Sequence, residues 1–342
     1  MGKTVLIQRL RNAAENNTLF PIEIEAPEER SLPAVLGPAL RTALLRMSRR
    51  EEAKDAVKRA LGVLGNFIRT MKVRFQDIEV GLDASSETGV ADSGDLESDL
   101  VDLLSSVAET AALHKTAVIL FIDELQYIPE PQLAALIMAL HRASSRQLPL
   151  TMIAAGLPQI LGQTGRSKSY AERLFEFIPV GPLDREDARK ALCLPAEQKG
   201  VSFEESAILE VLAATGGYPY FIQEWGKHAW NESKNSPITR EDARHVGQVA
   251  IAELATSFFR VRFDRLPPSE KKYMRAMAEL GQGPHRSGDI AEVLEKPISA
   301  VAPIRARLIQ KGMIYSPSHG GTAFTVPLFD GFMKRTIPMF VP

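Results

Sequence analysis

Two short stretches of this sequence could together hold a phosphate group and a metal ion. Gly2, Lys3 and Thr4 are the last three positions of the pattern G-x-x-x-x-G-K-[ST], in which backbone amides and a lysine hold phosphates. Asp123 and Glu124 directly follow the apolar run VILFI, which is typical of a buried parallel strand. The tripeptide alone is weak evidence, and the acidic pair could simply cap the next turn. Their combination favours a site for a nucleoside triphosphate.

Each of these residues has a chemical role in such a site. Lys3 would neutralise the β- and γ-phosphates of ATP, and the hydroxyl of Thr4 would bind Mg²⁺. Asp123 would hold the same Mg²⁺ through water, and Glu124 would polarise the attacking water. Ligands of open α/β sheets gather beyond the carboxyl ends of parallel strands, so a position just after VILFI suits this chemistry.

The elements that must position these residues alternate between helices and strands. The sequence predicts helices at 4–16, 34–70, 96–114 and 130–144, and strands at 19–25, 73–81, 118–122, 150–155 and 175–183. This alternation predicts an α/β fold with a parallel sheet covered by helices. The segment 83–99 has six acidic and no basic residues, which is typical of a solvated loop.

The phosphate-binding pattern lacks its first half. The first glycine, the four loop residues and the strand before them are missing ahead of Gly2. Without that N-terminal strand, we expect unpaired sheet edges beside VILFI. We favour the interpretation that the N-terminus is incomplete. The alternatives are that the chain is a fragment or that it has lost nucleotide binding.

The second half of the chain is predicted to be helical and then to end in a small mixed domain. Helices are expected at 184–194, 203–214, 218–231 and 239–258. From Pro268 onward three helices are followed by two strands around a tip at 316–322, which is the order of a winged helix. We therefore predict three domains, an α/β core at 1–183, a helical domain at 184–259 and a winged helix at 260–342.

With these motifs in place, the chain resembles P-loop ATPases of the AAA+ and STAND (signal transduction ATPases with numerous domains) groups, near the archaeal-type ATPases related to origin-recognition proteins. The resemblance covers nearly the whole chain and rests on GKTVLIQRL, VILFIDELQYI, TMIAAGLPQI, ERLFEFIPVGPL and GGYPYFIQEWG. It implies a P-loop NTPase sheet, a helical lid at 184–259 and ATP with Mg²⁺ as cofactors. Asp123 and Glu124 would be the Walker B pair, and Pro219 would pack near the adenine. Arg173 resembles the arginine that one subunit inserts into its neighbour's site, which implies a homo-oligomer.

Two departures from that family pattern predict slow hydrolysis. The sensor-1 position usually carries a polar residue, whereas Ala154, Ala155 and Gly156 have no side chain that can bind a γ-phosphate. GGYPY also lacks the sensor-2 arginine of standard AAA+ lids. The first hypothesis is an ATP-controlled switch. The alternative is a non-catalytic regulator or interaction module, in which the nucleotide site is degenerate and the winged helix carries the function.

The C-terminal quarter is the basic end of a chain whose net charge is −1. It contains 13 Lys and Arg against 7 Asp and Glu. If its third helix enters a major groove, Arg305, Arg307 and Lys311 could contact double-stranded DNA, and Lys334 and Arg335 could reach phosphates. The tip SPSHGGT has no Lys or Arg, so phosphate contacts are more credible than base reading. Docking of a protein partner is the alternative.

Composition excludes several other classes. The single cysteine, Cys193, cannot form an internal disulfide, and no apolar run approaches the roughly 18 residues of a membrane span. We therefore expect no membrane partner and a cytoplasmic location. The six histidines show no metal-ligand spacing among themselves, and the short QEW around Trp225 is read as helix packing.

Overall fold

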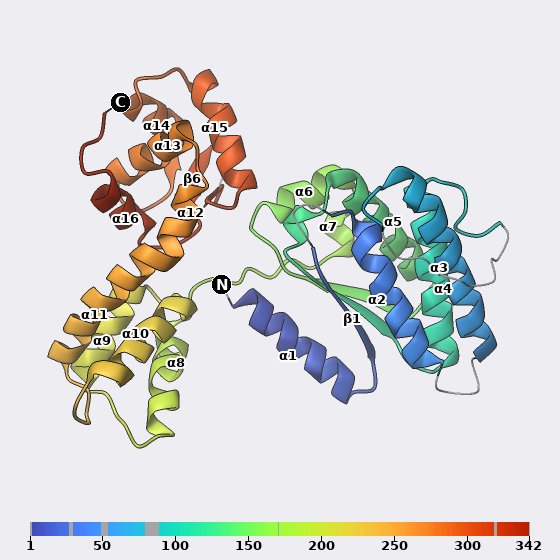
Figure 1. The fold of residues 1–342 in the computed structure, drawn as a ribbon, viewed down its shortest axis with the longest axis horizontal. Helices are drawn as coiled ribbons and strands as arrows, with labels where there is room; N and C mark the ends of the chain where they lie inside the picture. Colours follow the sequence, from blue (N-terminus) through green and yellow to red (C-terminus); the bar gives the residue numbers. More distant parts are fainter. Residues whose placement is uncertain are drawn as a thin grey trace. The chain divides into compact units, whose positions relative to one another are not determined.

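The computed structural model describes residues 2–26, 30–48, 54–78, 89–169, 171–317 and 320–341. Contacts divide the chain into two compact units, one at Lys3–Ile178 and the other at Pro179–Pro342 grouped with Gly2 (Figure 1). The first boundary lies close to the predicted end of the α/β core. The contacts do not divide the second unit further, and the three-domain division stays a prediction.

The first unit is built on a parallel sheet of three strands, which confirms the predicted α/β class. Its strands are β1 (Phe20–Glu25), β2 (Val118–Asp123) and β3 (Leu150–Ala154), in the order β1-β2-β3. Phe20 lies opposite Val118, and Val118 lies opposite Leu150. VILFI is therefore paired on both sides, and the expectation of an unpaired edge beside it is wrong. The unpaired edges within the described residues are those of β1 and β3.

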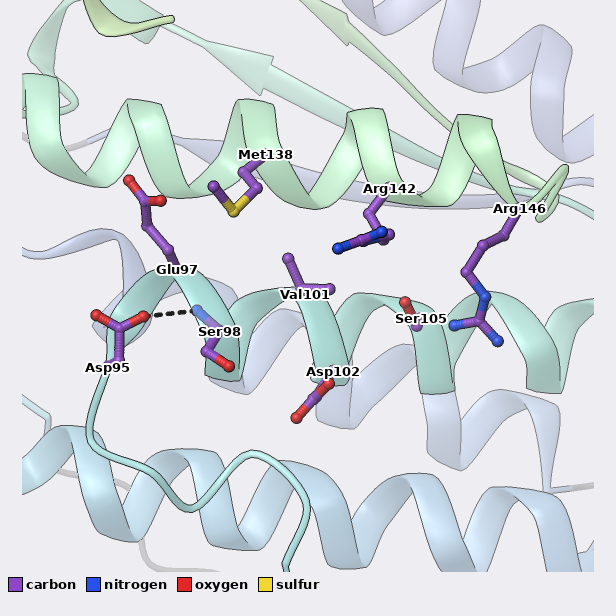
Figure 2. Close-up of a pocket in the computed structure, with 9 residues that line it drawn as sticks. All are labelled: Asp95, Glu97, Ser98, Val101, Asp102, Ser105, Met138, Arg142 and Arg146. Carbon is purple, nitrogen blue, oxygen red and sulfur yellow. Dashed lines mark hydrogen bonds between the residues drawn. The ribbon is translucent and has the colours of Figure 1, made fainter.

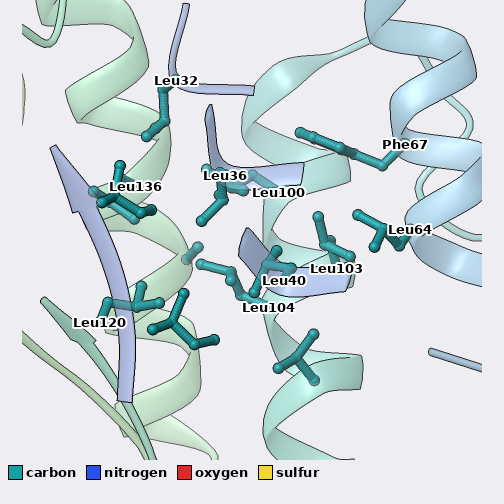
Figure 3. Packing of buried hydrophobic residues seen from close by; sticks show 14 of the residues in the cluster. Leu32, Leu36, Leu40, Leu64, Phe67, Leu100, Leu103, Leu104, Leu120 and Leu136 are labelled. Atoms are coloured by element: carbon teal, nitrogen blue, oxygen red, sulfur yellow. The ribbon is translucent and has the colours of Figure 1, made fainter. Parts of the chain in front are cut away.

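One face of this sheet packs on α1 and the other on several helices. The helices of the first unit are α1 (Lys3–Asn16), α2 (Leu32–Met47), α3 (Lys54–Arg74), α4 (Leu96–Leu113), α5 (Glu130–Ser145), α6 (Ile160–Ser167) and α7 (Ala171–Leu174). Side chains alternate along β2, so Ile119 and Phe121 pack with Ile7 of α1. Leu120 and Ile122 face the larger cluster formed with α2, α3, α4 and α5 (Figure 3).

Two predicted strands do not form in the part of the chain that the structure describes. Val73 is still in α3, which ends at Arg74, and residues 75–78 form a turn; 79–81 lie outside the described residues. Residues 175–183 are irregular, although FEFIPV alternates like a strand. A strand needs a neighbour to satisfy its backbone groups. Residues 175–183 pair with none of the described strands, although the outer edge of β3 is open, so no strand forms there.

The second unit begins with a group of helices near their predicted positions. These are α8 (Arg185–Glu197), α9 (Glu205–Thr215), α10 (Pro219–Glu232), α11 (Arg240–Leu254), a π-helical turn at Ala255–Phe259 and α12 (Arg260–Asp264). Asp184 caps α8, and a capping box of Thr239 and Asp242 starts α11. Cys193 is buried on α8, and burial raises the pKa of its thiol.

The remaining elements include the predicted three helices followed by two strands, with β4 and α16 in addition. They are α13 (Pro268–Glu279), β4 (His285–Arg286), α14 (Ser287–Val293), α15 (Ile298–Gln310), β5 (Ile314–Tyr315), β6 (Gly321–Phe324) and α16 (Phe329–Thr336). The strands form an antiparallel sheet in the order β4-β6-β5. Phe259 packs on Phe329 and Phe332, with ring centroids 5.4 Å apart in both pairs. These elements and α8–α12 therefore share one hydrophobic cluster. No helix in the described ranges is long and apolar enough to cross a membrane.

Candidate nucleotide site

Four of the residues singled out in the sequence lie together at the carboxyl end of the parallel sheet. Lys3 and Thr4 are the first two residues of α1, Asp123 is the last residue of β2, and Glu124 follows it. The first turn of α1 carries no acidic side chain, so its partial positive charge is uncompensated within the helix. A helix start of this kind attracts anions, phosphate among them.

Two hydrogen bonds connect α1 to the ends of the strands. Thr4 Oγ1 donates to Asp123 Oδ2 over 2.5 Å, although the two residues are 119 positions apart. Lys3 Nζ donates to the carbonyl oxygen of Gly156, just beyond β3, over 2.9 Å. An ammonium group has three donors, so this bond leaves two for an anion. The contacts place the hydroxyl of Thr4 on the Asp123 carboxylate and tie the Lys3 ammonium to the backbone just beyond β3.

Glu124 is held by a residue that sequence reasoning did not single out. The amide nitrogen of Gln126 donates to Glu124 Oε2, and Gln126 Oε1 accepts from the backbone N–H of Leu157 over 3.0 Å. Glu124 itself has a left-handed backbone with φ 53°, and its N–H donates to Asp123 Oδ1 over 2.9 Å. Gln126 thus connects the Glu124 carboxylate to the segment after β3. The only sequence signal was its place two residues after the acidic pair.

Gly156, two residues beyond β3, packs closely against Gln126 and Ile160. A Cβ at Gly156 would lie 2.9 Å from Gln126 Oε1 and 2.8 Å from Ile160 Cδ1. The polar atoms at the end of β3 are therefore the Gly156 carbonyl and the Gln126 amide, rather than a side chain of residues 154–156. The expected sensor-1 position at residues 154–156 therefore has these two polar groups beside it.

The donor set fits ATP with Mg²⁺. Hydroxyl and carboxylate oxygens are ligands that Mg²⁺ prefers, and Thr4 and Asp123 supply one of each. The ammonium of Lys3 and the start of α1 supply the charge and the donors that a phosphate chain needs. Gly2 directly precedes α1 with φ 89°, a conformation that glycine adopts readily.

The other two predicted nucleotide-site residues belong to other elements, and their roles stay predictions. Arg173 is exposed on α7 and forms no hydrogen bond or ion pair within the described ranges. Pro219 belongs to the second unit, where it starts α10. Gly216 ends α9 in the left-handed conformation, and a Cβ at Gly217 would collide with the Leu183 carbonyl oxygen. Turn geometry therefore accounts for this Gly-Gly-Tyr-Pro segment, and its role as a lid stays a prediction.

The three predicted DNA-contacting residues all have partners within the protein, although Arg307 and Lys311 are partly exposed to solvent. Arg305 donates to Thr322 Oγ1 (2.8 Å) and to the Gly321 carbonyl oxygen (2.7 Å), which ties α15 to β6. Arg307 and Lys311 both pair with the buried carboxylate of Glu270 on α13, at 3.2 and 2.8 Å. These interactions stabilise the packing of α13, α15 and the hairpin. Among the basic residues named from the sequence, Lys334 and Arg335 are exposed on α16.

A separate groove of about 580 Å³ lies between α4 and α5 (Figure 2). Its rim carries acidic residues of α4 and its start, and arginines of α5. Glu97 pairs with Lys168 at 3.0 Å, and Arg146 pairs with Glu109 at 2.6 Å. None of the nucleotide-site residues lines it, so this groove does not belong to the candidate site.

Two family models match parts of the chain. Residues 1–153 match the family described as AAA ATPase domain, and residues 256–333 match a family described as a domain of unknown function (DUF8462). A comparison with curated protein sequences finds no match. The first match includes Lys3, Thr4, Asp123 and Glu124. The first unit is therefore similar to an AAA ATPase domain over the segment that carries the candidate site.

Solved structures support the same fold. The Walker-type ATPase PABY2304 of Pyrococcus abyssi is similar with a TM-score of 0.53 and 16% identity, covering 94% of this chain and 86% of that one. Aeropyrum pernix Orc1 in complex with DNA has a TM-score of 0.44 and 14% identity, covering 98% and 84%. The Thermotoga maritima RuvB Holliday junction branch migration motor has a TM-score of 0.35 and 14% identity, covering 75% of this chain and 86% of that one. Because the last two TM-scores are below 0.5, only the first similarity supports the P-loop NTPase fold.

Proposed function

We propose that this chain binds ATP with Mg²⁺ at the carboxyl end of its parallel sheet and works as a nucleotide-controlled switch that hydrolyses ATP slowly. The observation that carries the proposal is the 2.5 Å hydrogen bond between Thr4 Oγ1 and Asp123 Oδ2. It joins the two oxygen ligands expected for one Mg²⁺ from segments far apart in the sequence. The AAA ATPase domain match over residues 1–153 supports the same assignment.

Each residue of the site then has a defined task. Lys3 and the start of α1 bind the phosphates, and Thr4 with Asp123 holds Mg²⁺, which when bound neutralises charge on the phosphate oxygens. Glu124 accepts a hydrogen bond from the attacking water and orients it. Gln126 fixes the carboxylate of Glu124 through its own bond to the Leu157 N–H. The roles of Arg173 and Pro219, in a neighbouring subunit's site and near adenine, belong to the same proposal.

The magnesium dependence of nucleotide binding tests this assignment. We expect a fluorescent ATP analogue to bind the full chain more tightly with Mg²⁺ than with EDTA. In Asp123→Asn the difference should largely disappear, while binding in EDTA is retained. Asp55→Asn, at an exposed position on α3, is the matched control and should behave like the wild type. An Asp123→Asn variant with the full magnesium effect would contradict the assignment.

A second candidate function is a regulator that binds nucleotide without hydrolysing it. The observation that favours it is the absence of a polar side chain at Ala154, Ala155 and Gly156, after β3. Phosphate release under single-turnover conditions separates the two functions. Hydrolysis that Glu124→Gln abolishes while ATP binding persists supports the slow ATPase. Release that is equal in wild type and Glu124→Gln supports the non-catalytic regulator.

For the second unit we propose a winged helix that contacts double-stranded DNA through phosphates. The support is the order of α13–α15, β5 and β6, together with the basic composition of the last quarter of the chain. Because Arg305, Arg307 and Lys311 have internal partners, Lys334 and Arg335 on α16 are the better candidates for phosphate contacts. Affinity for a random-sequence duplex should fall as salt rises, and the slope should shrink in the Lys334→Ala/Arg335→Ala double variant. Duplex binding that does not weaken as salt rises would exclude phosphate contacts. The alternative, that this domain docks a protein partner, would then be favoured.

A further inference from the structure

A cluster of three potential metal ligands lies where α10 and α11 pack together, in the second unit. Glu224 and His228 are four positions apart on α10 and so project from the same face of that helix. Glu253 comes from the last turn of α11. One ligand atom from each of the three side chains lies within 4.8 Å of the others. Among the described residues this is the only such group of histidine, cysteine and carboxylate side chains.

The histidine supplies a second observation that points to a ligand. His228 is 6% exposed, and its Nε2 is a buried nitrogen without a hydrogen-bond partner in the described structure. This nitrogen lies 2.8 Å from Glu253 Oε2, so the buried edge of the ring is directed at the ligand cluster. A buried polar atom without a partner carries a desolvation cost. Coordination of a cation between Nε2 and the carboxylates would remove that cost.

The opposite side of the imidazole ring has the arrangement found around metal-binding histidines. His228 Nδ1 lies 3.5 Å from Glu232 Oε1, one turn further along α10. A carboxylate beside the second ring nitrogen favours a proton on Nδ1, which leaves the lone pair of Nε2 free for a metal. Glu232 would therefore orient the ring without being a ligand itself.

A lysine occupies the space between the two carboxylates in the metal-free protein. Lys227 Nζ lies 3.2 Å from Glu224 Oε2 and 3.0 Å from Glu253 Oε1. Its ammonium balances two negative charges that would otherwise repel each other. The Lys227 side chain is 47% exposed, so it can turn into solvent when a divalent ion takes its place. Lys227 is thus a competitor whose removal should strengthen metal binding.

We propose that Glu224, His228 and Glu253 form a binding site for a divalent transition-metal ion of the zinc class, which clamps α10 to α11. One imidazole and two carboxylates with an exposed side suit Zn²⁺ with water as a further ligand. Zinc distances of about 2.0–2.2 Å place neighbouring ligand atoms roughly 3.3 Å apart. Small side-chain rotations would bring the three atoms from their present spacing to that value. This site is distinct from the nucleotide site and does not depend on it.

Zinc titration of the EDTA-stripped full chain tests the proposal, with Zn²⁺ measured by competition against a chromophoric chelator. We expect one saturable site that is at least about tenfold weaker in Glu253→Gln and in His228→Gln, and tighter in Lys227→Gln. Glu241→Gln, on the exposed face of α11, is the matched control and should bind like the wild type. Because His228 is buried and its variant can misfold, the half-exposed Glu253 provides the decisive comparison.

Two further measurements complete the test. Bound Co²⁺ should show visible absorption bands typical of nitrogen and oxygen ligands, and Zn²⁺ should raise the thermal midpoint of the wild type but not of Glu253→Gln. The proposal is overturned if neither the wild type nor Lys227→Gln binds Zn²⁺ saturably. It is equally overturned if Glu253→Gln binds as tightly as Glu241→Gln, since the zinc would then sit at another histidine.

Discussion

Thr4 Oγ1 and Asp123 Oδ2 are 2.5 Å apart, which joins the start of the first helix to the end of the central strand. The contact places a hydroxyl and a carboxylate at one point, while the ammonium of the preceding residue, Lys3, bonds to the Gly156 carbonyl. A phosphate chain and Mg²⁺ need these three groups together. The nucleotide proposal therefore depends on this small set of contacts more than on any other feature of the fold.

Removing the hydroxyl of Thr4 should weaken ATP binding only when magnesium is present. Thr4→Val keeps the shape of the side chain and deletes the oxygen, so we expect about tenfold weaker binding with Mg²⁺ and no change in EDTA. Isothermal calorimetry in the two buffers measures both values. Thr42→Val is the control, because Thr42 Oγ1 is also exposed on a helix but bonds only to the Pro38 carbonyl. Equal effects in both buffers would show that Thr4 does not act through the metal.

Replacing Gln126 should slow hydrolysis without changing nucleotide affinity. Gln126→Leu removes the amide that holds Glu124 Oε2, so the carboxylate loses its fixed orientation. We expect kcat to fall by about tenfold with KM nearly unchanged, which is less than the loss of the base itself. Phosphate release measured over a range of ATP concentrations separates kcat from KM.

Gln163→Leu is the matched control for this effect. Its amide also has a backbone partner, because Gln163 Nε2 donates to the Ile128 carbonyl oxygen, but it forms no hydrogen bond with Glu124. A general packing defect would lower activity in both variants. If Gln126→Leu raises KM and leaves kcat intact, Gln126 does not position the base.

Enlarging Gly156 should destabilise the first unit. The added methyl group of Gly156→Ala would meet Gln126 Oε1 at 2.9 Å and Ile160 Cδ1 at 2.8 Å, so one of them must move. We expect a loss of about 1–3 kcal/mol, typical of overpacking. Gly165→Ala is the control, because there the nearest atom, Glu172 Oε1, lies at an ordinary 3.5 Å. Urea unfolding followed by circular dichroism measures both, and equal stability of the two variants would contradict the packing account.

The Glu270 pairs predict that Arg307 matters more for folding than for DNA. Glu270 has a side chain only 1% exposed, so Arg307→Ala leaves it with Lys311 as its remaining partner. Because Arg307 itself is half-exposed, we expect a loss of about 1–3 kcal/mol rather than that of a fully buried pair. Lys296→Ala, at an exposed position, should have no measurable effect. The account is contradicted if Arg307→Ala is as stable as the wild type and its DNA affinity depends less steeply on salt concentration. Arg307 would then contact phosphate.

The fold could be predicted from the sequence where the burial of side chains determines which residues are apolar. VILFI is apolar on both faces because Ile119 and Phe121 pack on α1, while Leu120 and Ile122 pack on the opposite helices. The same reasoning failed at 73–81 and 175–183, where alternation suggested strands. Val73 is 89% exposed at the end of α3, and FEFIPV has no strand beside it within the described ranges. Local alternation does not reveal whether a neighbour exists.

At the candidate sites, too, the sequence predicted only the residues that belong to a local pattern. Lys3, Thr4, Asp123 and Glu124 could be named because their order along the chain is a recognisable pattern. Gln126 could not, because its role depends on the backbone of Leu157, 31 positions away. Spacing among histidines missed the zinc-class cluster, since His228 has carboxylates as partners and one of them comes from another helix. Reading QEW only as helix packing overlooked Glu224, four positions before that histidine.

Calorimetric titration of the full chain with MgATP, compared between Lys3→Ala and Lys58→Ala, tests the central claim most directly. Lys58 is exposed on α3, so its variant controls for the loss of one surface charge. The account predicts saturable binding by the wild type and by Lys58→Ala, and binding at least about tenfold weaker in Lys3→Ala, since the charged contact to phosphate is lost. Equal binding by both variants, or no binding by the wild type, would contradict it.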